Sequence, residues 1–202
     1  MMKKNWYLIF SFFIIFGYLF SQTHDVSVLA IISPVDTIKE DTTIFPIAQI
    51  TNLGTAEDSF PCLFRITDNN GSVVYFNIDT IRLMPGETIQ YTFSESWQAI
   101  RGNYTVRCST MLEGDENNNN DFKDSSLFVI AHDVGVEYLI SPVDTVLAGT
   151  LVTPQALVKN YGNVNESFDV IFRIGDVYED TVSVNNLLPD SVLTVTFNSW
   201  TA

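Results

Sequence analysis

The sequence predicts an all-β protein made of tandem copies of one β-sandwich module. Apolar and polar residues alternate with a period of two after the N-terminal apolar run, and no window there shows the 3.6-residue period of a helix. The segment from His24 to Ile66 recurs from His132 to Ile174 at a constant offset of 108 residues. Self-similarity over a length typical of a domain indicates that the chain repeats one folding unit.

The first 22 residues have the features of a signal peptide. Lys3 and Lys4 precede an apolar run over residues 6–20, and the small polar residue Ser21 follows it. The run is shorter than the roughly 20 residues with which a helix spans a bilayer, which favours a cleaved signal over a membrane anchor. We therefore expect residues 1–22 to be a signal peptide and the mature protein to be secreted, either extracellular or at the cell surface.

Seven strands are expected in the first copy, residues 24–131, with turn-forming stretches such as SPVD, NLGT, DNNG and PGE between them. They cover Val26–Ile32, Ile44–Asn52, Ser59–Thr67, Val73–Ile81, Thr88–Ser94, Asn103–Met111 and Ser125–Ile130. Seven short strands in a domain of this length are typical of an immunoglobulin-like sandwich of two sheets. Alternation along the third and sixth strands assigns one set of side chains to the core: Phe60, Cys62, Phe64, Ile66, Tyr104, Val106 and Cys108.

The second copy, residues 132–202, matches only part of the first. Trp200 aligns with Trp97, and each tryptophan closes the fifth strand of its copy, where burial is the simplest role for an aromatic side chain. The counterparts of the last two strands do not follow, so we expect a truncated second sandwich with an unpaired strand edge. A longer repeat array is favoured, and completion by a strand from another subunit is the alternative.

The order and spacing of these motifs resemble a known family. HDV-x-V, SPVDT, N-x-G and the tryptophan occur in both copies, and L-x-PG, G-x-Y-x-V-x-CST and GD-x4-ND occur in the first. Together they are similar to the CARDB module, the cell-adhesion-related domain found in bacteria. The second copy departs from the first at Asp190 in place of Gly86 and at Val170 in place of Cys62. The resemblance implies immunoglobulin-like tandem repeats in extracellular proteins that act in adhesion or as stalks, and it implies no catalysis.

The charge of the chain restricts its partners. Its formal net charge is −14, and removal of Lys3 and Lys4 makes the mature form more negative still. Such a field repels phosphate, which excludes nucleic acid as a partner, and it favours solubility, cation binding and repulsion between copies. The partners that we expect are an unknown protein or glycan surface and the neighbouring repeats of the same chain.

One loop has the pattern of a calcium ligand set. Asp115, Asn117, Asn119 and Asp121 place oxygen-bearing side chains at alternate positions of the sequence GDENNNND. Calcium takes six to eight oxygens, and such loops supply them. The loop lacks the sixth-position glycine and distal glutamate of an EF-hand, and Asn-rich turns also form without metal. Calcium binding and a simple turn between the last two strands are both open, and we expect no other cofactor.

The two cysteines lie on strands that an immunoglobulin-like sandwich places side by side. Cys62 is near the start of the third strand and Cys108 near the end of the sixth, and both face the core by alternation. A disulfide is possible if their Cα atoms lie about 4.4 to 6.8 Å apart. A disulfide and two buried free thiols are equally compatible with the sequence.

No catalytic constellation is recognisable. The sequence has no G-x-S-x-G, no Cys-x-x-Cys and no phosphate-binding glycine loop, and its histidines, His24 and His132, lie 108 residues apart at the repeat starts. We expect a protein that is not an enzyme but a structural or adhesive module of a longer surface protein. The alternative is an accessory or spacer domain of a secreted enzyme whose catalytic domain lies outside this chain.

Overall fold

The computed structural model describes residues 21–202, which form strands and loops without a helix. The all-β prediction is therefore confirmed for this part of the chain. The predicted signal peptide, residues 1–22, falls outside the described residues except for Ser21 and Gln22. Over residues 21–202, the chain contains no helix with the length and apolar character that a membrane crossing requires.

The N-terminal half, Val26–Ile130, contains two main sheets around one core. Its strands are β1 Val26–Ser33, β2 Asp36–Lys39, β3 Thr43–Ile44, β4 Ile47–Asn52, β5 Asp58–Asp68, β6 Val73–Leu83, β7 Thr88–Thr92, β8 Trp97–Gln98, β9 Gly102–Thr110 and β10 Phe122–Ile130. One sheet has the order β1-β4-β7 and the other β2-β10-β9-β5-β6, while β3 pairs with β8. This arrangement is consistent with an immunoglobulin-like sandwich.

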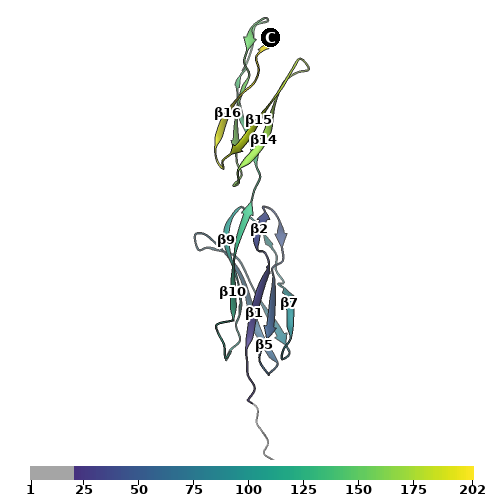
Figure 1. The fold of residues 1–202 in the computed structure, drawn as a ribbon, viewed down its shortest axis with the longest axis vertical. Helices are drawn as coiled ribbons and strands as arrows, with labels where there is room; N and C mark the ends of the chain where they lie inside the picture. The colour runs from purple at the N-terminus through teal and green to yellow at the C-terminus, as the bar shows by residue number, and fades with distance from the viewer. Residues whose placement is uncertain (1–20) are drawn as a thin grey trace, which may run out of the picture.

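The C-terminal half, Val134–Thr201, lies end to end with the first half along the long axis of the molecule (Figure 1). Its strands are β11 Val134–Ser141, β12 Leu151–Val152, β13 Gln155–Asn160, β14 Glu166–Ile174, β15 Tyr178–Leu187, β16 Val192–Thr196 and β17 Trp200–Thr201. They form the sheets β11-β13-β16, β14-β15 and β12-β17. No sheet of the described residues contains strands from both halves.

Local structure repeats at the same offset as the sequence. Val26 pairs with Asn52 in β1 and β4, and Val134 pairs with Asn160 in β11 and β13, with register shifts at equivalent places. In the repeated SPVDT segments both Ser-Pro peptide bonds are cis, and Asp36 and Asp144 both adopt a left-handed conformation, with φ of 58° and 59°. Aspartate is among the few residues that tolerate this region.

Three short strands differ from the predicted boundaries. The segment expected as one strand over Ile44–Asn52 is divided into β3 and β4, because Pro46 has no N–H to continue a ladder. β2 was expected as a turn, but it runs parallel to β10, with Asp36 opposite Leu127. β8 contains Trp97, which pairs with Ile44. Parallel pairing between distant segments leaves no local pattern in the sequence, so β2 could not be predicted.

The core contains the side chains that alternation assigned to it. All of the predicted core residues of the third and sixth strands are buried: Phe60, Cys62, Phe64, Ile66, Tyr104, Val106 and Cys108. The ring of Phe64 on β5 packs against the ring of Phe93, the residue after β7, with centroids 5.0 Å apart. This contact joins the two sheets. Trp97 is buried against Tyr104, and Trp200 is half-buried, so both tryptophans serve packing.

Candidate functional site at the chain entry

The N-x-G motif holds the incoming chain against the N-terminal half. Asn52 is fully buried at the end of β4, and its side chain accepts a hydrogen bond from the Gly54 N–H (2.8 Å) and donates to the backbone oxygens of Ala56 (2.8 Å) and Leu83 (3.1 Å). These bonds fix the turn at Asn52–Ala56, which we call the entry turn. A Cβ at Gly54 would lie 2.4 Å from the backbone oxygen of Thr23, so only glycine permits this approach.

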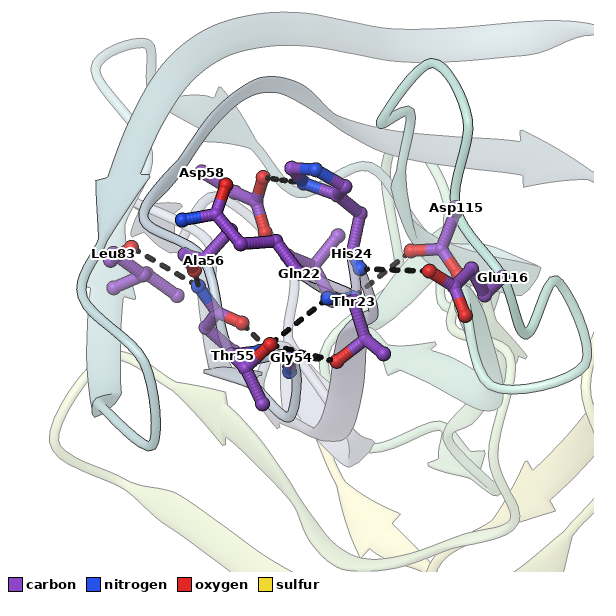
Figure 2. Close-up of polar contacts among 12 residues, drawn as sticks. Gln22, Thr23, His24, Gly54, Thr55, Ala56, Asp58, Leu83, Asp115 and Glu116 are labelled. Carbon is purple, nitrogen blue, oxygen red and sulfur yellow. Dashed lines mark hydrogen bonds and ion pairs between the residues drawn. The ribbon is translucent and has the colours of Figure 1, made fainter. Parts of the chain in front are cut away.

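Thr23 completes the contact with main-chain and side-chain bonds (Figure 2). Its backbone oxygen accepts from the N–H of Thr55 (2.9 Å), and its own N–H donates to the hydroxyl of Thr55 (2.9 Å). The entry turn therefore holds the preceding segment mainly by backbone groups.

His24 links the start of β5 to the loop between β9 and β10. Its Nδ1 lies 2.6 Å from Oδ1 of Asp58, a buried carboxylate at the start of β5. Its backbone N–H donates to Glu116 (3.3 Å) and its backbone oxygen accepts from the Glu116 N–H (2.8 Å), so β5 and this loop meet at this one residue (Figure 2). The other carboxylate oxygen of Asp58 is buried and has no hydrogen-bond partner among residues 21–202.

Asp115 acts as a structural residue of the same loop. Its Oδ2 accepts from the N–H of Val26 (2.9 Å) and its Oδ1 accepts from the N–H of Asn117 (2.8 Å), which joins the loop to the first residue of β1. Both carboxylate oxygens are thus used by the backbone. Such bonds are typical of aspartate in turns, and they explain why this aspartate is buried.

The structure brings together only part of the predicted calcium ligand set. Asp115 and Asp121 lie close enough that burial, together with the charges of Asp115 and Asp25, raises the pKa of Asp121. The side chain of Asn119 is exposed. Among residues 21–202, no three His, Cys, Asp or Glu side chains form a metal-binding group, although Oδ1 of Asp121 is buried without a hydrogen-bond partner there. Calcium binding stays a prediction.

The joint between the halves has the same construction as the chain entry. Asn160 accepts from the Gly162 N–H (2.8 Å) and donates to Val164 and Leu187 oxygens. A Cβ at Gly162 would lie 2.3 Å from the backbone oxygen of Ala131, much as a Cβ at Gly54 would lie 2.4 Å from the backbone oxygen of Thr23. His132 repeats the acid contact, with Nδ1 2.6 Å from Oε1 of Glu166.

Two further residues fasten this joint. Asn163 accepts from the Ala131 N–H (2.8 Å) and donates to the Val129 oxygen (2.8 Å), so its amide spans the last residues of the N-terminal half. Arg101 bonds both oxygens of Glu40 and donates to the backbone oxygen of Tyr161 (2.6 Å) across the joint. The Arg101 hydrogen bonds hold the pKa of Glu40 below its usual value.

The two cysteines are neighbours in the core, as the sequence predicts. In the β5–β9 register Cys62 is opposite Thr110 and Cys108 is opposite Phe64, so the cysteines are diagonal neighbours, and their sulfurs lie 3.7 Å apart as free thiols. The bond to the Cys62 thiol and burial raise the pKa of Cys108, so its reactive thiolate form is disfavoured. A disulfide between them stays a prediction.

The hydrogen-bonding groups of the entry site are arranged to hold the incoming chain and the start of β1 in place. Thr23, His24, Thr55 and Asp115 bond backbone groups or adjacent side chains, and the His24–Asp58 pair has no nucleophile hydrogen-bonded to it within residues 21–202. Sequence reasoning missed Asp58, Glu116 and Arg101. A signal for the first existed, because an acidic residue follows each histidine by 34 positions, as Asp58 and Glu166 show.

Comparison with known proteins yields a match among solved structures. That structure is the CARDB domain of the PF1109 protein from Pyrococcus furiosus, in complex with di-metal ions. It is 19% identical, covers 54% of this chain and 92% of its own, and has a TM-score of 0.37. That domain bears the name of the family that the sequence motifs resemble. No protein-family model and no curated protein matches the chain.

Proposed function

We propose that this protein is a non-catalytic extracellular module with a structural and adhesive role, within a longer surface protein of tandem immunoglobulin-like domains. The observation that carries the proposal is the repeated joint. The residues shared by the two halves, Asn52 and Gly54 with Asn160 and Gly162, hold the incoming chain in the same way at both places. A repeated joint suits a chain whose modules succeed one another in a fixed geometry.

The domain boundaries that we propose follow from the same joint. Residues 24–131 form one immunoglobulin-like domain, and residues 132–202 form part of a second. Ala131 marks the boundary, because the core clusters on its two sides share no residue. The net charge of −14 supports an extended arrangement, since like-charged modules repel one another.

The adhesive role is supported by an exposed apolar row on β6. Val74, Phe76 and Ile78 point away from the core on this edge strand, while the intervening Tyr75 and Asn77 are buried. Exposed apolar groups in a row are a feature of surfaces that bind partners. The partner that this surface fits is a protein or the apolar face of a glycan, and the acidic charge disfavours nucleic acid.

The location can be tested with a tagged chain of residues 1–202 expressed in bacteria. We expect the tag outside the cytoplasm, and a mature N-terminus near Ser21 by mass spectrometry. A full-length, cytoplasmic product would contradict the proposal. Lys3 and Lys4 changed to Glu give a matched control that should stay in the cytoplasm, because a signal peptide requires its positive N-terminal region.

The adhesive role has its own test. Beads coated with the protein are presented to bacterial and host cell surfaces, and retention is compared between the wild type and the variant Phe76→Ser, Ile78→Ser. We expect the variant to lose most retention, with Leu53→Ser, also exposed, as the control. Equal retention of all three would remove the adhesive role, and a hydrolytic activity in the purified parent polypeptide would favour the accessory domain of an enzyme instead.

A further inference from the structure

The two halves differ at one face of the core. Val26 and Val28 on β1 are fully buried, whereas their counterparts on β11 are open: Val134 is 39% exposed and Val136 is 54% exposed. Both pairs occupy the same register against the next strand of their sheet, because Val26 lies opposite Asn52 and Val134 opposite Asn160. The difference therefore comes from what covers these valines and not from their position in the sheet.

In the N-terminal half, the cover is the hairpin of β9 and β10. β9 pairs along β5 from Cys62 opposite Thr110 to Asp68 opposite Tyr104, and β10 pairs with β9. Both strands contact β1, so Tyr104, Val106 and Cys108 join the same core cluster as Val26 and Val28. The hairpin thus closes the sandwich and extends its second sheet.

In the C-terminal half, the corresponding edge is unpaired within the described residues. β14, the counterpart of β5, pairs only with β15 there, and its other edge carries free N–H and C=O groups. Beside this edge lies a groove of about 190 Å³ between the two sheets. Its apolar lining consists of Val134, Val136, Val158, Phe168, Val170 and Ile171.

A second difference between the halves lies at the same place. Asp36–Lys39 forms β2 because β10 lies beside it, yet the repeated sequence beginning at Asp144 forms no strand. Val143, just before that segment, and Leu147 within it are largely exposed. One hairpin, with a first strand against β14 and a second strand against this segment, would account for both differences.

The geometry points to this groove as a docking site for an antiparallel β-hairpin built like Gly102–Ile130. The first strand of the occupant pairs with β14 and places apolar side chains at alternate positions over Val134, Val136 and Val170. This inference goes beyond the proposed function, because it concerns the edge of β14 wherever the protein resides. Strand addition supplies main-chain hydrogen bonds for affinity and apolar pockets for selectivity.

Other occupants fit less well. A second copy of the chain would have to release its own β9–β10 hairpin, whose residues Val106 and Leu127 are buried in its core. A glycan has no row of backbone donors and acceptors to match the edge of β14. The hairpin is the one partner whose complementarity is already displayed elsewhere in the molecule, on β5 and β1.

The test uses the full chain and a synthetic peptide of Gly102–Ile130 carrying Cys108→Val. The substitution prevents oxidation, and it gives an apolar partner for Val170, which stands where the N-terminal half has Cys62. We expect saturable binding by calorimetry, and hydrogen exchange should show new protection of β14 amides. The substitution Val136→Lys places a charge under the docked hairpin and should weaken binding by about tenfold or more. Val177→Lys, at a valine in the β14–β15 turn that is also exposed, should leave binding unchanged.

Each alternative outcome is decisive. Absence of binding with a peptide that stays soluble, or equal binding by both lysine variants, would overturn the inference. Analytical sedimentation of the chain alone tests whether a second copy occupies the groove. A dimer that Val136→Lys dissociates into monomers would place another copy there and overturn the hairpin proposal. If the free peptide aggregates, residues Ile100–Ala131 appended after Ala202 provide the second measurement, with the same expected protection of β14 and the same two variants.

Discussion

The guanidinium of Arg101 donates a hydrogen bond to the backbone oxygen of Tyr161 at 2.6 Å, and this bond crosses from one half of the molecule to the other. Arg101 is itself oriented by two bonds to Glu40. Because its target is a backbone group, the contact requires only the position of residue 161.

Replacing Arg101 should loosen the joint with little effect on the fold of either half. We expect Arg101→Ala to widen the distribution of orientations between the two halves in small-angle scattering. The rotational correlation time of each half, measured by ¹⁵N relaxation, should become shorter because the halves tumble more independently. The unfolding free energy should change by less than about 1 kcal/mol, since exposed ion pairs contribute little. Arg82→Ala, which removes an exposed pair with Glu57 far from the joint, should leave scattering unchanged.

Replacing Asn52 should be costly for the N-terminal half. Its side chain makes three hydrogen bonds in the core, and Asn52→Ala removes all three: the Gly54 N–H keeps only its longer bond to the Asp25 oxygen (3.1 Å), and the oxygens of Ala56 and Leu83 lose the amide donor. We expect a loss of about 2–4 kcal/mol in urea unfolding followed by tryptophan fluorescence. The exposed Asn69→Ala should stay within about 0.5 kcal/mol of the wild type, and a similarly small loss for Asn52 would contradict the role given to the entry turn.

Asp121 should make stability depend on pH in an unusual direction. Its pKa is raised in the folded state by burial and by the charges of Asp115 and Asp25, so folding favours the protonated acid. Its contribution is favourable below the unfolded pKa near ~3.9 and is lost as pH rises through the higher folded value. At pH 7 without calcium, Asp121→Asn should therefore stabilise the protein slightly, by less than about 1 kcal/mol.

Calcium should reverse this preference if the loop binds it. A cation near Asp121 and Asp115 would stabilise the ionised acids, so the melting temperature of the wild type should rise with calcium over chelator. Asp121→Asn should show a much smaller rise, and Asp124→Asn on the adjacent strand serves as the control. Equal midpoints with calcium and chelator in the wild type would remove the predicted site.

The cysteines should be inert in the folded, reduced protein. The bond to the Cys62 thiol and burial raise the pKa of Cys108, and both cysteines are fully buried, so a thiol reagent should react with neither residue until denaturant is added. Intact mass before and after reduction then tells whether the exported protein carries the disulfide, by the gain of two hydrogen atoms. Rapid labelling of the native reduced protein would contradict the packing described for β5 and β9.

Residues 24–131 should fold alone, because their core is covered on both faces. A separately expressed segment 132–202 should show poor amide dispersion, since Val134 and Val136 lie open at the groove. The spectrum of each segment is compared with that of the full chain. A well-dispersed spectrum from 132–202 would show that the smaller core suffices.

Sequence pattern predicted what depends on alternation and on repetition. The burial of Phe60, Phe64 and Val106 and the adjacency of the two cysteines followed from period two and from the sandwich topology. The reason for N-x-G could not be read in advance, since a glycine required by an approaching carbonyl looks like any turn glycine. The partners of His24 were hidden for a similar reason, because hydrogen bonds between distant loops leave no local periodicity.

The contact of Gly54 with Thr23, and of Gly162 with Ala131, has a consequence for how such proteins diversify. Each glycine faces a main-chain oxygen, which every amino acid possesses, and the residue supplying it differs between the two places. The joint thus imposes its geometry without prescribing the identity of the preceding residue. A segment that carries this glycine can therefore follow different chains during evolution while its connection to the preceding residues stays the same.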